Sequence, residues 1–92
     1  MPYLLAHDLG TSGNKATLYT TEGRLMASRV HPYDLLVTHG NWAEQRADDW
    51  WQAVRRTTQE LTALVDPADI EAVSFSGQMM GCLCLDVAGR PL

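Results

Sequence analysis

Alternating apolar and polar residues in the first third of the chain predict three paired strands. Residues 3–6 form a short apolar run, and residues 15–20 alternate between two faces, with Ala16 and Leu18 on one of them. Residues 24–30 resume the alternation after a turn that contains Gly23. The connections are far shorter than the dozen or so residues that a parallel crossover needs. The pattern therefore predicts an antiparallel meander.

The period changes near residue 47 and predicts one main helix. Residues with helical spacing follow from there: Trp50, Val54, Thr57, Thr58, Leu61, Leu64 and Val65. Asp48 and Asp49 favour the positive end of the helix dipole in its first turn. The pair Asp66-Pro67 predicts its end, because the residue before a proline avoids helical backbone. Residues 31–41, between the meander and the helix, lack clean periodicity and predict a loop or an irregular strand.

Two further strands are predicted after the helix. Residues 72–76 form a compact strand that ends at Gly77, and a right-handed crossover lets it pair parallel to a meander strand. Residues 82–87 predict another strand, followed by a turn. The fold class is an α/β sheet with at least one uncovered edge or face. The chain stops where a returning strand is expected, so we interpret residues 1–92 as an incomplete domain.

The composition excludes several classes of partner. The chain has 92 residues, is 46% hydrophobic and carries a formal net charge of -4, which is typical of one small globular domain. No run of Lys or Arg forms a basic stripe, so we expect neither nucleic acid nor a membrane surface as a partner. No apolar stretch approaches the roughly 18 residues of a membrane span. The N-terminus lacks the basic start of a signal peptide, and we expect a cytoplasmic location.

The two cysteines are interpreted as reduced core residues. Cys82 and Cys84 lie in an apolar run. A strand would place both on one face without the spacing that a disulfide usually needs. No further cysteine or nearby histidine completes a set of metal ligands.

The polar stretch HDLGTSGNK, residues 7–15, is the first candidate for chemistry. It matches neither of the common glycine-rich phosphate motifs, and it leads into a strand instead of a helix. Its glycines still allow backbone N–H groups to form a concave anion site, to which Thr11 and Ser12 add hydroxyl donors. Asp8 suits a magnesium ion that bridges phosphate oxygens, and Lys15 adds positive charge. Taken alone, the stretch also fits a simple turn.

Three segments resemble the FGGY carbohydrate kinases, and they occur in the same order. Residues 8–15, DLGTSGNK, resemble the D-x-G-T-[ST]-x-x-[KR] phosphate hairpin of that family. Residues 41–45, NWAEQ, with the following WWQA, resemble its xylulokinase branch, as do residues 76–81, SGQMMG. The resemblance covers nearly the whole chain. It implies the N-terminal segment of a ribonuclease-H-like domain of the actin, sugar kinase and Hsp70 superfamily.

The resemblance implies an ATP-dependent kinase that phosphorylates a hydroxyl of a ketopentose such as xylulose, or of a related sugar or polyol. Asp8 would organise Mg²⁺ and ATP, directly or through water. The ATP phosphates would lie on Gly10, Thr11, Ser12 and Lys15. The sugar would contact Gln78, Met79, Met80 and Gly81, which follow a strand that is expected to be central in the sheet.

One sugar-site position departs from the family pattern. Xylulokinases carry histidine where this chain has Met80. Methionine does not donate a hydrogen bond to a sugar hydroxyl. The sequence therefore predicts a ketose or polyol pocket and leaves xylulose itself open. The alternative is that Met79 and Met80 fill core space.

Other residues carry weaker hypotheses. Trp42 is a candidate for stacking on a sugar, while one of the adjacent pair Trp50 and Trp51 is expected in the core. The three histidines are expected to be structural or solvated. The family's catalytic base and adenine-binding domain lie beyond this length, so we expect the chain alone to be inactive. The competing hypothesis is a non-enzymatic nucleotide-binding or self-assembling module, whose exposed sheet edge pairs with a second copy to form a homodimer, or with another chain.

Overall fold

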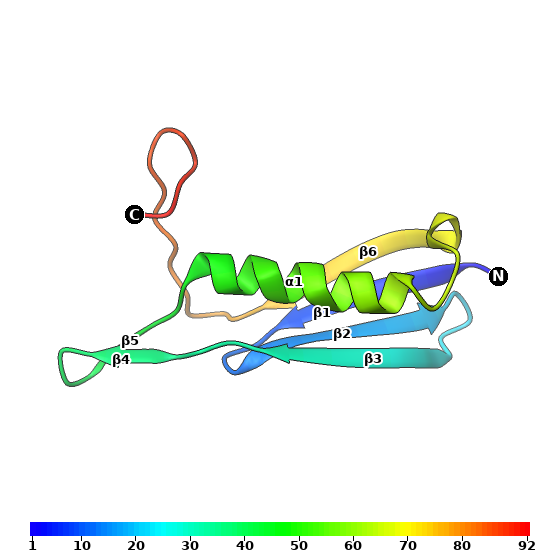
Figure 1. Ribbon diagram of the computed structural model, residues 1–92, viewed down its shortest axis with the longest axis horizontal. Helices are drawn as coiled ribbons and strands as arrows, with labels where there is room; N and C mark the ends of the chain where they lie inside the picture. The colour runs from blue at the N-terminus through cyan, green and yellow to red at the C-terminus, as the bar shows by residue number, and fades with distance from the viewer.

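The computed structural model describes residues 1–92 and shows an open four-stranded sheet with one long helix that runs along its strands (Figure 1). The strand order is β3-β2-β1-β6. The bounds are Tyr3–Leu9 for β1, Gly13–Thr20 for β2, Leu25–Pro32 for β3 and Ile70–Gly77 for β6. The first three strands pair antiparallel, and β6 runs parallel to β1. The predicted meander and the parallel return are both confirmed.

The stretch between the meander and the helix contains a second, small sheet. Strands β4 (Leu36–Thr38) and β5 (Trp42–Glu44) pair antiparallel and extend past the end of the main sheet (Figure 1). His39 and Gly40 both have positive φ, 51° and 82°, which turns the chain back on itself within a few residues. Of the two alternatives predicted for residues 31–41, the short strand β4 agrees with an irregular strand, and a loop is wrong for this part of the chain.

Helix α1 (Ala47–Thr62) covers the sheet with a narrow stripe of buried residues, Ala53, Thr57 and Leu61. Their spacing of four residues places them on one face. The helix ends four residues before Asp66, earlier than predicted. Pro67 instead begins a short 3-10 helix, η1 (Pro67–Asp69), in which the Asp66 side chain accepts a hydrogen bond from the Ala68 N–H at 3.0 Å.

The core lies between α1 and the meander. Leu5, Ala16, Leu18 and Leu61 are buried there. Because α1 packs on β2 and β3, Val73 and Phe75 of β6 remain about half exposed. The opposite face of the sheet has no helix on it (Figure 1). The predicted uncovered face is confirmed, whereas pairing of two copies through an edge strand stays a prediction.

The predicted strand over residues 82–87 is wrong. A single bridge between Leu85 and Pro91 closes a projecting loop, which the Asp86 carboxylate stabilises by accepting from the Ala88 and Arg90 N–H groups at 2.9 and 3.0 Å (Figure 1). A strand needs a neighbour for its backbone hydrogen bonds, and the alternation of residue types does not supply one.

The cysteines are exposed, so their assignment to the core is also wrong. They are free thiols, and the Sγ atoms of Cys82 and Cys84 lie 3.8 Å apart. The hydrogen bond with Cys82, followed by the charge of that group, raises the pKa of Cys84. Both thiols therefore belong to the surface of the C-terminal segment.

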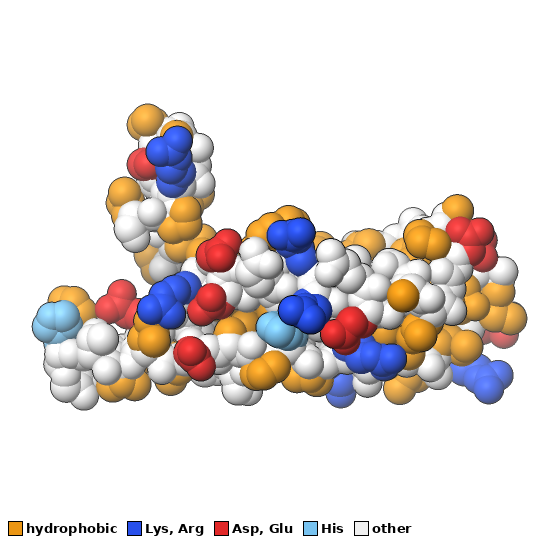
Figure 2. All heavy atoms as spheres, viewed as in Figure 1, with side chains coloured by type: hydrophobic (Ala, Val, Ile, Leu, Met, Phe, Trp, Pro, Cys, Tyr) orange, Lys and Arg blue, Asp and Glu red, His pale blue; other side chains and the backbone are white.

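Charge on the visible face of the molecule is mixed. Figure 2 shows basic and acidic side chains interspersed over the helix, without a continuous basic stripe. The absence of a nucleic-acid partner remains a prediction from composition. No helix has the length and apolar character that crossing a membrane requires.

Gly13 is required where β2 approaches β3. A Cβ atom at this position would lie 2.8 Å from the His31 carbonyl oxygen and 3.0 Å from the Pro32 Cα atom. Both contacts are with backbone, so Gly13→Ala is expected to lower the free energy of unfolding by about 1 to 3 kcal/mol in urea denaturation. Gly81→Ala is the matched control, because nothing lies within 4 Å of its added Cβ. Equal stability of the two variants would contradict the close approach.

Candidate functional site

The candidate site lies where β1 and β6 end side by side. Leu9 and Gly77, the last residues of these parallel strands, are paired in register. The loop between β1 and β2, residues 10–12 and here called the β1–β2 loop, therefore meets the segment that begins at Gln78. Ligand sites of open α/β sheets commonly occur at such carboxyl ends. In this chain, however, β6 is an edge strand and not the central strand that was expected.

The first two carbonyl oxygens of the β1–β2 loop accept hydrogen bonds from side chains of other segments. The Gly10 carbonyl accepts hydrogen bonds from the Tyr33 hydroxyl and from Gln78 Nε2, the latter at 3.1 Å. The Thr11 carbonyl accepts from Gln45 Nε2. Sequence reasoning assigned no role to Tyr33 or Gln45 in this loop, although Gln45 lies in the NWAEQ segment.

The remaining carbonyls of the turn are bound too, which sets the direction of the amides. The Ser12 carbonyl accepts from the Tyr33 N–H at 3.2 Å, and the Gly13 carbonyl accepts from the Gly10 N–H at 3.0 Å. All peptides are trans, so each N–H points away from the carbonyl of the preceding residue. The N–H groups of Thr11 and Ser12 thus face away from these contacts and donate to no protein acceptor. Two adjacent outward amides can bind an anion.

Asp8 shares its face of the sheet with a cation and a hydroxyl. It lies opposite Lys15 on β2 and opposite Ser76 on β6, and residues directly opposite each other point to the same side. The Ser76 hydroxyl donates to Asp8 Oδ1 at 3.2 Å. The side chain of Asp8 is exposed on the face that α1 does not cover.

Around the β1–β2 loop, Asp8 is a single carboxylate beside a candidate phosphate site, and this arrangement would suit Mg²⁺ only together with bound phosphate. No group of three or more His, Cys, Asp or Glu residues is placed to hold a metal ion. Mg²⁺ is usually held by one or two carboxylates, phosphate oxygens and water instead of a full protein cage. Asp8 next to the outward amides of Thr11 and Ser12 satisfies that requirement.

Most of the predicted site residues meet in one open cavity of about 280 Å³. From the prediction, its lining contains Asp8, Gly10, Thr11, Gln78, Met79 and Met80. Ser12 and Lys15 lie outside this lining, and Gly81 lines two neighbouring cavities instead. Met79 and Met80 are 94% and 97% exposed, so the alternative that they fill core space is wrong.

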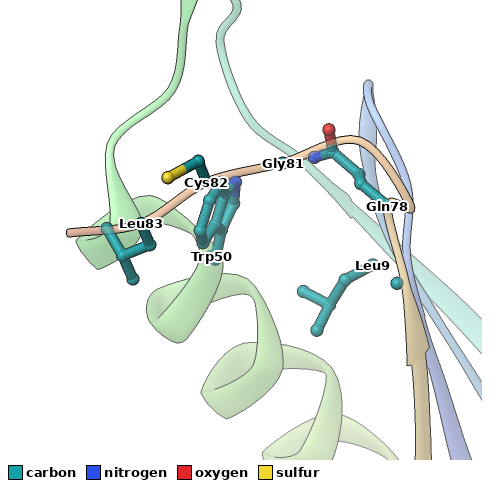
Figure 3. A pocket seen from close by; sticks show the side chains of 7 residues that line it. Leu9, Trp50, Gln78, Gly81, Cys82 and Leu83 are labelled. Carbon is teal, nitrogen blue, oxygen red and sulfur yellow. The ribbon is translucent and has the colours of Figure 1, made fainter.

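A second cavity, of about 260 Å³, lies between α1 and the segment after β6 (Figure 3). Trp50 projects from α1 toward the chain at Gly81 and Cys82 in this view. Its indole N–H donates to Gln45 Oε1 at 3.1 Å. Trp50 is half-buried and Trp51 is 58% exposed, so the expected core tryptophan is absent.

Trp42 lies away from the cavity that the predicted residues line. Its ring packs against His39 at 4.5 Å between centroids, within the β4–β5 hairpin. It is 57% exposed and is not among the residues around the 280 Å³ cavity. Stacking on a sugar stays a prediction for this residue.

His7 has a structural role on the face of the sheet that α1 covers, opposite to the face of Asp8. Its Nδ1 lies 2.9 Å from Asn14 Nδ2, and its Nε2 lies 3.2 Å from the Thr58 hydroxyl. The amide nitrogen of Asn14 can only donate, so Nδ1 accepts and the ring proton is assigned to Nε2. Burial lowers the pKa of His7, and its ring stacks on Phe75 at 5.0 Å. This neutral cluster joins both strands of the hairpin to α1 next to Asp8.

Tyr33 keeps its proton and so can donate to the loop. Burial, and to a lesser extent the Asp8 charge, raises the pKa of Tyr33, while a hydrogen bond with Gln78 lowers it in part. The net direction is upward. The phenol therefore remains a hydroxyl donor to the Gly10 carbonyl.

Comparison with known proteins finds relatives that are similar in sequence and in fold. A xylulose kinase of Escherichia coli is 35% identical over 85 residues, covering 92% of this chain and 18% of the relative. A glycerol kinase of Nostoc is 32% identical over 93 residues, covering 98% of this chain and 19% of the relative. The ligand-bound xylulose kinase structure from Lactobacillus acidophilus superposes with a TM-score of 0.94 at 30% identity, over 100% of this chain and 19% of that one.

These likenesses define the fold as that of the sugar kinases, which is the actin and Hsp70-like fold. The model for the N-terminal domain of the FGGY family of carbohydrate kinases matches residues 3–92. The chain belongs to the FGGY family of carbohydrate kinases. It spans about a fifth of the length of these relatives.

Proposed function

We propose that residues 1–92, in a protein of the relatives' length, supply the phosphate-binding hairpin and one wall of the sugar site of an ATP-dependent kinase. The reaction would transfer the ATP γ-phosphate to a hydroxyl of a ketopentose such as xylulose, or of a related sugar or polyol. The observation that carries the proposal is the outward pair of amides at Thr11 and Ser12, beside Asp8 and Gln78. Relatives named as xylulose and glycerol kinases support the substrate class.

Each polar group of the hairpin has a role in this proposal. The N–H groups of Thr11 and Ser12 bind oxygens of the terminal phosphates, and Lys15 offsets their negative charge. The Asp8 carboxylate orients the metal-bound phosphates from the adjacent strand. Mg²⁺, when bound, would neutralise charge on the phosphate oxygens. Phosphoryl transfer depends mostly on such positioning and charge neutralisation.

The segment after β6 is proposed to face the sugar through its exposed residues. Met79 and Met80 line the same cavity as Asp8 and present thioethers, which accept hydrogen bonds weakly and donate none. The amide nitrogen of Gln78 is already bound to Gly10 and Gln45, which leaves its oxygen for a sugar hydroxyl. The donors and acceptors that distinguish one sugar from another must therefore come mainly from elsewhere in the protein.

The 92-residue chain alone is proposed to be inactive. In this proposal the chain supplies only one wall of the phosphate site. Asp8 is the only carboxylate in the cavity that it lines, and it is assigned to the phosphates, so no second carboxylate there can act as the base on a sugar hydroxyl. The cytoplasmic location expected from the sequence is part of the same proposal.

Measurement of ADP release tests this function. The full-length gene product is incubated with MgATP and, separately, with D-xylulose, D-ribulose and glycerol. We expect one of these or a related polyol to stimulate ADP release, with a phosphorylated product detected by mass spectrometry. The 92-residue chain alone should release no ADP above background. If no ketose or polyol stimulates the full-length protein, the proposed function is wrong.

A further inference from the structure

Gln45 is the only side chain that is hydrogen-bonded to the β1–β2 loop, to α1 and to the segment that begins at Gln78. Its Nε2 donates to the Thr11 carbonyl in the β1–β2 loop. Its Oε1 accepts from the Trp50 indole at 3.1 Å and from Gln78 Nε2 at 2.8 Å. Gln78 in turn donates to the Gly10 carbonyl. We call this pair of side chains, Gln45 and Gln78, the glutamine bridge.

The chemistry of the partners fixes the orientation of the Gln45 amide. The indole N–H of Trp50 only donates, so it must face the amide oxygen. The Thr11 carbonyl only accepts, so it must face the amide nitrogen. A side chain that meets both needs at once has to carry a donor and an acceptor on the same planar group, as glutamine does. Glutamate would keep the accepted bonds and lose the donated one.

The bridge acts on the amides that face the phosphate. A trans peptide has its C=O and N–H groups in opposite directions. By holding the Gly10 and Thr11 carbonyls, the bridge directs the N–H groups of Thr11 and Ser12 outward. Gln45 is the only donor to the Thr11 carbonyl, whereas the Gly10 carbonyl is also bound by the Tyr33 hydroxyl. Without Gln45, the peptide between Thr11 and Ser12 is free to rotate and to present its carbonyl to the anion.

We propose that Gln45 is a positioning residue for phosphoryl transfer, which holds the Thr11 carbonyl so that the β1–β2 loop presents its amides to the ATP phosphates. This proposal rests on the proposed function. Gln45 itself is half-buried behind the loop and lies outside the cavity lined by Asp8. It acts through Thr11 and not by touching ATP.

Steady-state kinetics of the full-length protein, with the sugar or polyol that stimulates ADP release in the assay described above, tests the proposal. Gln45→Met keeps the length of the side chain and removes all three hydrogen bonds. We expect the KM for MgATP to rise about tenfold or more, as for other groups that orient a ligand-binding shell. Gln45→Glu is expected to raise the same KM while keeping its bonds to Trp50 and Gln78, and so to keep a melting temperature close to that of the wild type.

Gln59→Met is the matched control. Gln59 is exposed on α1, its side chain makes no hydrogen bond, and methionine has a similar helix propensity. We expect its KM for MgATP and its melting temperature to match the wild type. A merely structural role of Gln45 would lower the melting temperature and the active fraction, and so kcat, with KM unchanged.

The possible failures are distinguishable. If the wild type phosphorylates a sugar and both Gln45 variants retain its KM for MgATP, the positioning role of Gln45 is wrong and the proposed function stands. If the wild type phosphorylates none, the proposed function is wrong, and the positioning role falls with it.

Discussion

Asp8→Asn is expected to reduce kcat of the full-length protein by about 10²- to 10³-fold, the loss seen when one charge-stabilising group is removed from an active site. The substitution changes charge and little else. Asparagine keeps an oxygen that can accept from Ser76, whose hydroxyl lies 3.2 Å from Asp8 Oδ1. The loss in kcat therefore measures the contribution of the negative charge of Asp8, which the proposal assigns to orienting the metal-bound phosphates. Steady-state ADP release with saturating sugar and MgATP measures it.

Asp34 provides a control for Asp8. Asp34 is exposed and takes no part in the hydrogen bonds of the β1–β2 loop. Asp34→Asn removes the same charge and is expected to leave kcat within about twofold, because the Asp34 carboxylate faces solvent and exposed charges interact only weakly with their surroundings. If Asp8→Asn and Asp34→Asn have the same kcat, Asp8 is not the group that orients the phosphates.

Leu18→Ala is expected to have the largest effect on stability. Leu18 is 1% exposed and packs with Leu5 and Leu61 between the sheet and α1. Truncating such a leucine removes apolar contacts and leaves a cavity, which costs about 2 to 5 kcal/mol. The loss should appear as a lower free energy of unfolding in urea denaturation. It would also weaken the packing of α1, which carries Trp50, on the strands that carry the site.

Leu25→Ala provides the comparison for the core. Leu25 lies on the neighbouring strand β3 and is 54% exposed. The same truncation there should cost about 1 kcal/mol or less, because only part of the side chain leaves an apolar environment. Similar costs at Leu18 and Leu25 would be inconsistent with a core confined to the helix-covered face.

The sequence could predict those elements whose stability comes from local periodicity. Residues 15–20 alternate because one face of β2 packs under α1, and the helical spacing of Thr57 and Leu61 reflects the other side of that contact. The β4–β5 hairpin was missed because three-residue strands are too short to show a period. Residues 82–87 alternate, but no neighbouring strand supplies their backbone partners.

The candidate site was predictable in its exposed parts and not in its supports. Asp8, Thr11 and Gln78 carry recognisable chemistry at a motif, and the structure brings them to one cavity. Gln45 and Tyr33 act by binding backbone carbonyls of residues 34 and 23 positions away. A bond to a backbone atom leaves no trace in the identity of its partner, so no pairing of residue types could reveal it.

A crystal structure of the full-length protein with magnesium and a non-hydrolysable ATP analogue tests the central claim most directly. The claim is that the β1–β2 loop is a phosphate clamp. We predict phosphate oxygens within about 3 Å of the backbone nitrogens of Thr11 and Ser12, the distance of a hydrogen bond, with Asp8 beside the metal ion. Triphosphate bound elsewhere, with these two amides facing solvent, would contradict the account.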